Sequence, residues 1–283
     1  DDFRRAAVHW LQGHVCTITV VGDAGTGRTS FIDYALHTTL EGLPTVRRSL
    51  NRTVASEERL AEELSALAGG KVEKDLDRLK LRLRNRKERV VAVVEQAEHL
   101  FLRSVDGMHT LRKFLWMVGE TSDSVLWILS MNTHAWRFLD SVMQVSDTFT
   151  HVLPLRPLDK SELENLIMTR HRVSGYRLMF DEDLKGMRRL RHVIEALLPG
   201  RDEQDDPQEL LRQAYFERLH EISGGNPMLG VYHWLRSVSQ LEGEPDLLHV
   251  THVERVDLSF LDRLDTDKLL ALANVILHNG LSI

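Results

Sequence analysis

Strand-like and helix-like patterns alternate through the first half of the chain. The clearest strand-like segments are uninterrupted apolar runs rich in β-branched residues, which are typical of strands buried on both faces of a sheet. The predicted strands cover residues 15–21, 44–50, 90–94, 125–130 and 150–155. The predicted helices between them cover residues 29–36, 56–68, 73–88 and 106–118. Because strands that alternate with helices indicate βαβ units, we expect an α/β fold with a parallel sheet.

The pattern changes after Pro157, where the strand-like runs stop. Helical spacing follows and is interrupted by an acidic linker at 199–207. The predicted helices of this part cover residues 159–172, 181–197, 207–223 and 227–241, with one or two more within 260–278. We therefore expect an α/β core at 1–156, an all-helical lid at 157–250 and the start of a further domain at 251–283.

Composition narrows the class of protein. Of the 283 residues, 42% are hydrophobic and 28% are charged, which is typical of a globular chain with a sizeable core. A single cysteine excludes a disulfide framework and a cysteine-built zinc site, and with no export signal it favours the cytoplasm. No apolar run reaches the roughly 18–20 residues that span a bilayer. Because the chain starts at Asp1 without a Met and stops within a helical pattern, we expect it to be a piece of a longer polypeptide.

Charge argues against a generic nucleic-acid coat but leaves a local patch open. The net charge is −6, yet seven basic residues are concentrated between Arg78 and Arg89. One interpretation is a patch that binds nucleic acid or anionic lipid. The other is the solvated face of a helix, which we favour because no aromatic residues for base stacking are interleaved.

A glycine-rich segment follows the first predicted strand and precedes a helix. Residues 22–29 have the phosphate-loop spacing G-x-x-x-x-G-K-[ST], with Arg28 in place of the Lys. Backbone N–H groups of such a loop surround phosphate oxygens, the helix N-terminus adds its dipole, and the Thr29 hydroxyl can bind Mg²⁺. The alternative is an ordinary glycine-rich turn with Arg28 as a surface charge. The candidate phosphate-binding residues are Gly22, Asp23, Ala24, Gly25, Thr26, Gly27, Arg28, Thr29 and Ser30.

Polar residues follow two further predicted strands. Glu95 stands where a strand-end carboxylate would hold the water shell of Mg²⁺, and Gln96 stands where a residue would orient the attacking water. Glu98 is a nearby carboxylate, for which we favour a solvated position in the first turn of a helix. Asn132 could sense a γ-phosphate, or it could simply cap the helix that follows it.

The order of these signals resembles the AAA+ and STAND branch of the phosphate-loop ATPases, which includes origin-recognition initiators and NB-ARC or NACHT switch proteins. Residues 22–29 resemble Walker A, Glu95 and Gln96 resemble Walker B, and Asn132 resembles sensor 1. Residues 225–227 resemble the G-x-P motif of a STAND lid, although a plain interhelical turn is the alternative. The tail from 261 resembles the opening of a winged-helix domain.

The resemblance implies that ATP or ADP binds with Mg²⁺ between the core and the lid. Thr29 and Glu95 would bind the metal. The catalytic residues would be Glu95, Gln96 and Asn132. Pro227 would contact the base. Further domains of the same polypeptide would receive the signal. A homo-oligomer and a nucleic-acid partner stay open, and the fragment has no membrane span.

Four elements depart from the pattern of an active ATPase. Arg28 replaces a Lys, Gln96 replaces a Glu, no arginine finger stands within 145–149, and no Arg directly follows Pro227. Together they imply a regulatory switch with weak or absent hydrolysis, in which movement of the lid transmits the nucleotide state. The alternatives are an active AAA+ ATPase that acts on DNA or a protein assembly, and an interaction scaffold that binds no nucleotide.

Overall fold

The computed structural model describes residues 1–54, 56–69, 72–181 and 206–278. The chain divides into two compact units, one formed by residues 1–155 and 263–283 and the other by residues 156–262. The segment 251–283, expected as one further domain, is therefore shared between the two units. The limits 1–156, 157–250 and 251–283 stay a prediction.

The first unit is built on a five-stranded parallel sheet, as the sequence predicts. Its strand order is β2-β3-β4-β1-β5, and every neighbouring pair is parallel. The strands are β1 (Thr17–Val21), β2 (Thr45–Ser49), β3 (Val90–Glu95), β4 (Val125–Met131) and β5 (His151–Pro154). Every residue of the three central strands is buried, which explains why their sequences are largely apolar.

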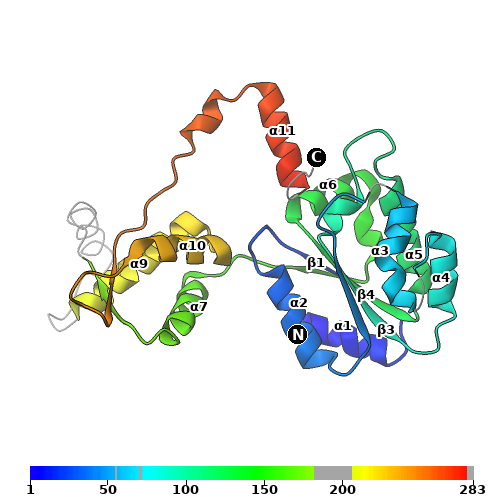
Figure 1. Ribbon diagram of the computed structural model, residues 1–283, viewed down its shortest axis with the longest axis horizontal. Coiled ribbons are helices and arrows are strands. Elements are labelled where there is room, and N and C mark those ends of the chain that lie inside the picture. Colours follow the sequence, from blue (N-terminus) through cyan, green and yellow to red (C-terminus); the bar gives the residue numbers. More distant parts are fainter. Residues whose placement is uncertain (55, 70–71, 182–205, 279–283) are drawn as a thin grey trace. The chain divides into compact units, whose positions relative to one another are not determined.

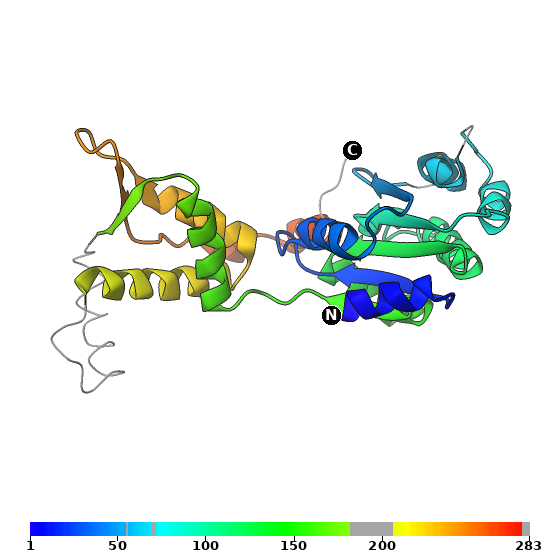
Figure 2. The ribbon, with the colours of Figure 1, turned by 90° about the horizontal axis from the view of Figure 1, so that it is seen from below.

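Helices cover both faces of this sheet (Figure 1, Figure 2). One face carries α1 (Asp2–Leu11) and α2 (Arg28–Thr39). The other carries α3 (Glu57–Ala68), α4 (Leu76–Arg84), α5 (His109–Thr121) and α6 (Thr133–Met143), with the 3-10 turns η1 (Ala97–Leu100) and η2 (Val145–Thr148).

The strands supply apolar side chains to both faces in alternation. On β3, Val91 and Val93 belong to the apolar cluster that includes α1 and α2. Val90, Ala92 and Val94 belong to the cluster on the opposite face. Successive residues of a strand point to opposite sides of a sheet, so a strand covered on both sides must be apolar at every position.

Two elements of the first unit differ from the sequence-based expectation. Helix α1 is missing from that expectation, although its buried residues Phe3, Ala6, Ala7 and Trp10 lie at helical spacing. Helix α11 (Thr266–Leu277) lies within 251–283, where the sequence predicts the start of a further domain. It packs instead against α6, and Leu277 joins the apolar cluster on that face.

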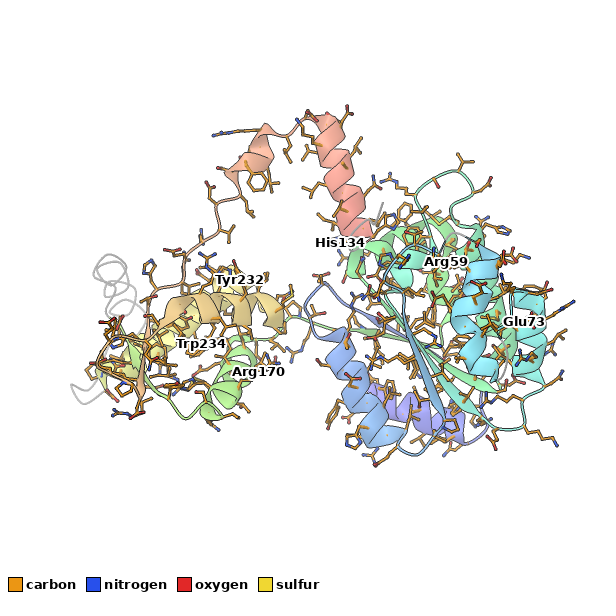
Figure 3. The ribbon with its side chains drawn as sticks, in the orientation of Figure 1. Arg59, Glu73, His134, Arg170, Tyr232 and Trp234 are labelled. Atoms are coloured by element: carbon orange, nitrogen blue, oxygen red, sulfur yellow. The ribbon has the colours of Figure 1, made fainter. Side chains whose placement is uncertain are left out.

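The second unit surrounds an aromatic core. Helices α7 (Lys160–Arg172), α9 (Pro207–Ser223) and α10 (Pro227–Ser237) supply most of it. Trp234 of α10, labelled in Figure 3, stacks on Phe216 of α9 with ring centroids 5.9 Å apart. The short turn η3 (Ser259–Arg263) lies at the end of this unit's segment.

The expectation that the second unit is all-helical is wrong. A three-stranded sheet of order β6-β8-β7 joins β6 (Arg177–Phe180), β7 (Val238–Ser239) and β8 (Leu247–Val250). These strands are only two to four residues long, too short to show a period of two in the sequence. The predicted helix at 181–197 and the predicted linker at 199–207 lie outside the described residues, apart from residues 181, 206 and 207.

In the described part of the chain, no helix is both long and apolar enough to cross a membrane.

Candidate nucleotide-binding site

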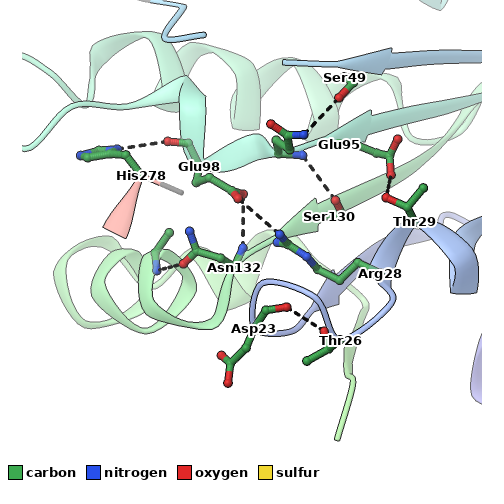
Figure 4. A network of polar contacts seen from close by, with 12 residues as sticks. Asp23, Thr26, Arg28, Thr29, Ser49, Glu95, Glu98, Ser130, Asn132 and His278 are labelled. Carbon is green, nitrogen blue, oxygen red and sulfur yellow. Dashed lines mark hydrogen bonds and ion pairs between the residues drawn. The ribbon is translucent and has the colours of Figure 1, made fainter. Parts of the chain in front are cut away.

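The loop between β1 and α2 needs its glycines. Gly25 and Gly27 have φ values of 80° and 92°, in the left-handed region that favours glycine. A Cβ atom on Gly22 would lie 2.6 Å from Thr26 Oγ1 and 3.2 Å from Leu155 Cβ. The N–H and the hydroxyl of Thr26 donate to the carbonyl oxygen of Asp23 at 3.2 and 2.8 Å, which holds the loop closed on itself (Figure 4).

Helix α2 begins without a side-chain cap. Gly27 occupies its N-cap position, and within the described residues no side chain caps its first turn. By contrast, Ser56, Asp75 and Asn132 cap α3, α4 and α6. The first N–H groups of α2, beginning at Arg28, are therefore oriented donors at the positive end of a helix, which is a favourable place for an anion.

Arg28 is a buried cation rather than a surface charge. It is 9% exposed, and its Nη2 lies 3.5 Å from Oε1 of Glu98, which is fully buried (Figure 4). Among the described residues, Nη1 of Arg28 and Oε1 of Glu98 have no hydrogen-bond partner. The expectation that Glu98 is solvated is wrong, because the 3-10 turn η1 buries Ala97, Glu98 and Leu100 together.

Glu95 is the last residue of β3, and its carboxylate accepts hydrogen bonds from side chains of two other elements. The Thr29 hydroxyl donates to Oε1 at 2.8 Å, and Nε of Arg47 donates to Oε2 at 2.7 Å. Arg47 also forms an ion pair with Asp33 of α2. The hydrogen bond to Glu95 and the one to Asp33 raise the pKa of Arg47 above its ordinary value. Sequence reasoning missed Arg47, which lies on β2 next to β3 and joins the site only through strand pairing.

The side chain of Gln96 is bonded away from the loop. Its backbone is left-handed, with a φ of 57°, and its N–H donates to Ser130 Oγ at 3.3 Å. Its amide Nε2 donates to Ser49 Oγ at 3.4 Å. In this arrangement the amide is held at the end of β2.

Both amide atoms of Asn132 are also engaged. Oδ1 accepts from the N–H of Ala135 at 2.7 Å and so caps α6, as the simpler interpretation predicts. Nδ2 donates to the carbonyl oxygen of Leu277 at 2.9 Å, and the backbone N–H donates to Glu98 Oε2 at 3.2 Å. The end of α11 therefore contacts the residue that resembles sensor 1.

Two buried histidines flank Glu98. Nδ1 of His278 lies 3.4 Å from the Glu98 carbonyl oxygen, and its ring packs on Phe101. Burial lowers the pKa of His278 and of His99 below the ordinary value. Both rings are therefore held neutral near pH 7, and neither adds a positive charge to the site.

The motif at 225–227 forms a tightly packed turn between helices. Gly225 has a φ of 73°, and a Cβ atom there would clash with the carbonyl oxygen of Leu158. Asn226 caps α10 by accepting from Met228 and Leu229, and Pro227 is the first residue of that helix. The contact of Pro227 with a base stays a prediction.

The side chains of the basic run between Arg78 and Arg89 largely make contacts within the first unit. Nζ of Lys80 lies 3.5 Å from the ring centroid of Trp116 and pairs with Glu120. Arg86 and Arg89 donate to the carbonyl oxygens of Leu67 and Trp10. These contacts support a structural role for the run.

Comparison with known proteins identifies a family and a fold. A model of the family described as Novel STAND NTPase 1 matches residues 3–193. No curated protein matches the chain. Among solved structures, C. elegans PCH-2 is 16% identical with a TM-score of 0.50, over 98% of this chain and 66% of that one.

Two further solved structures match with lower TM-scores. Aeropyrum pernix ORC1, solved in complex with DNA, is 18% identical with a TM-score of 0.49, over 79% of this chain and 58% of that one. Cdc6p from Pyrobaculum aerophilum is 16% identical with a TM-score of 0.45, over 80% of this chain and 61% of that one. The chain thus spans less than two thirds of each of these proteins.

Proposed function

Because the chain belongs to the Novel STAND NTPase 1 family, we propose that it is a nucleotide-binding module whose bound ATP or ADP acts as a regulatory switch for a larger protein. The phosphates would lie on residues 22–30. A free, buried Cys16 is in keeping with action in the cytoplasm.

The observation that carries the proposal is the unsatisfied hydrogen-bonding capacity of the Arg28 guanidinium. Its Nη1 is buried and, in the described residues, has no hydrogen-bond partner. A buried guanidinium N–H without an acceptor is costly, by about 1–3 kcal/mol. A phosphate oxygen would satisfy it, and the uncapped first turn of α2 provides further donors beside it.

The residues expected to hold Mg²⁺ do not fit it in this arrangement. Thr29 and Glu95 offer the hydroxyl and carboxylate oxygens that Mg²⁺ prefers. However, both oxygens of Glu95 already accept hydrogen bonds, from Thr29 and from Arg47. We therefore assign no step to the metal.

Weak hydrolysis is supported by where the polar side chains are bonded. Gln96 cannot accept a proton, and its amide is held by Ser49. Glu98, a carboxylate that could act as a base, faces Arg28. We expect ATP turnover well below about one per second, the low end of ordinary enzymes.

The contact between Asn132 and Leu277 supports the switch. A γ-phosphate that recruited the Asn132 amide would break its bond to the Leu277 carbonyl oxygen. The end of α11 would then be released from α6 and the rest of the first unit, and the lid and further domains would respond to that release as a shift between two populations.

A thermal-shift titration of the chain tests the proposal. ADP and ATP at millimolar concentration should each raise Tm, because a ligand that binds only the folded state stabilises it. Arg28→Ala should abolish the shift, and Arg112→Ala, which removes an exposed arginine of α5, should not. Wild-type protein without any shift would favour the scaffold alternative, and rapid ATP turnover would favour an active ATPase.

A further inference from the structure

We infer that Arg47 takes the place of the divalent cation at Glu95, so that this chain binds a nucleoside diphosphate without a metal ion. The inference rests on the proposed nucleotide site and concerns what that site requires.

The contacts at Glu95 carry the inference. The side chain of Glu95 is 8% exposed, and its Oε2 accepts from Arg47 Nε at 2.7 Å. A metal-bound water would have to donate to an oxygen of this carboxylate. Because Oε1 accepts from Thr29 and Oε2 from Arg47, each oxygen already has a strong donor.

Two other elements, β3 and α2, hold Arg47 in this position. Strand pairing sets Arg47 beside Val93, two residues before Glu95 on β3. Asp33 of α2 binds the guanidinium from the helix that follows the loop. Since arginine does not lose its charge at any ordinary pH, it is a permanent cation at the strand end.

Mg²⁺ or one of its waters would have to share the Glu95 carboxylate with this cation. Mg²⁺ demands near-octahedral oxygen ligands and gives up its waters reluctantly, so it gains little from a carboxylate that is already neutralised. A diphosphate, by contrast, needs only the donors of the loop and Arg28. The ligand class is therefore a nucleoside diphosphate free of metal.

The test compares the ADP affinity of the chain by calorimetry in excess EDTA and in Mg²⁺. We expect the dissociation constant of the wild type in EDTA to be no more than about threefold above that in Mg²⁺, because Mg²⁺ is not required and only withdraws free ADP from solution. Arg47→Ala should make binding metal-dependent, with affinity at least about tenfold higher in Mg²⁺ than in EDTA. Mn²⁺ titrated with ADP and followed by electron paramagnetic resonance should be bound by the variant and not by the wild type.

Arg48→Ala is the matched control. Arg48 is the next residue of the same strand, but its Nε donates to the Glu63 carbonyl oxygen, so this variant should behave as the wild type. If Arg47→Ala is too unstable, Arg47→Gln keeps a donor for Glu95 without the charge and should show the same metal dependence.

The outcomes separate the two proposals. Wild-type binding that weakens at least about tenfold in EDTA overturns the inference and leaves the nucleotide site standing. Metal-independent binding by the Arg47 variants also overturns it. No binding of ADP under either condition overturns the proposed function itself.

Discussion

Arg28 of the phosphate loop and Glu98 of the segment after β3 form a buried ion pair, with Nη2 3.5 Å from Oε1. Arg28 is the residue that would bind phosphate, and Glu98 carries a negative charge, as phosphate does. A nucleotide would therefore compete with Glu98 for Arg28. The stability of the ligand-free protein and its affinity for nucleotide would then be linked through this contact.

Glu98→Gln should weaken the empty protein and strengthen its response to nucleotide. Removing one partner of a buried pair leaves the other charge uncompensated, which costs roughly 3 kcal/mol. A phosphate would recover part of that loss, so the rise in unfolding free energy on adding ADP should exceed that of the wild type. Urea denaturation with and without ADP measures both effects. Glu88→Gln, at an exposed position, is the control, and an unchanged response in Glu98→Gln would contradict the competition.

Gly22→Ala should distort the loop. The new Cβ would lie 2.6 Å from Thr26 Oγ1 and 3.2 Å from Leu155 Cβ, so the loop must shift. We expect a loss of about 1–3 kcal/mol in stability and a loss of nucleotide binding. Gly119→Ala, within α5 and with no atom within 4 Å, should instead stabilise the protein by about 0.5–1 kcal/mol. Equal Tm values for the two variants would refute the steric argument.

Asn132→Ala should loosen α11 as well as α6. It removes the cap on Ala135 and the bond to the Leu277 carbonyl oxygen, and we expect a loss of about 1–2 kcal/mol. Hydrogen exchange of the amides in α11 should become faster. Ser56→Ala removes the cap of α3 without touching α11 and should leave that exchange unchanged. Equal protection of α11 in both variants would show that the bond to Leu277 does not hold the helix.

The second unit should be more stable in mild acid than in mild base. His249 lies between Glu244 and Asp181, with ring nitrogens 2.7 and 2.9 Å from their carboxylates. Hydrogen bonds to Glu244 and then Asp181 raise the pKa of His249, because the fold favours the charged ring. The stabilisation is complete below the pKa of the unfolded chain, about 6.5, and is lost as pH rises through the higher folded value.

An NMR titration of the His249 ring measures this pKa directly. Glu244→Gln should lower the pKa toward the ordinary value and flatten the pH dependence of unfolding above about pH 6.5. A folded-state pKa at or below that of an exposed histidine would contradict the prediction.

The core of the fold could be predicted because its determinants are local. The strands around Val93 and Ile128 are apolar on both faces, and the glycine spacing of the loop is visible without any long-range contact. The pairing of Val238 with Val250 is not visible in this way, because a two-residue strand has no period of its own.

The charges of the site could be predicted only in part. Glu95 and Arg28 follow from their positions in motifs. Arg47 reaches Glu95 across a strand pair, and the burial of Glu98 depends on a 3-10 turn that overrides the usual preference of a carboxylate for a solvated helix start. Contacts between elements distant in sequence decide both cases.

The pairing of charges at the site would also affect the speed of the proposed switch. Arg28 and Arg47 face the carboxylates of Glu98, Glu95 and Asp33, so two cations meet three anions. With one more anion than cations, this cluster has no positive field to draw an anion from solution, and electrostatic steering cannot accelerate its capture. We expect nucleotide to enter slowly and with little dependence on ionic strength. A module with these kinetics would fill slowly after a rise in nucleotide concentration, so its occupancy would lag behind brief changes in that concentration.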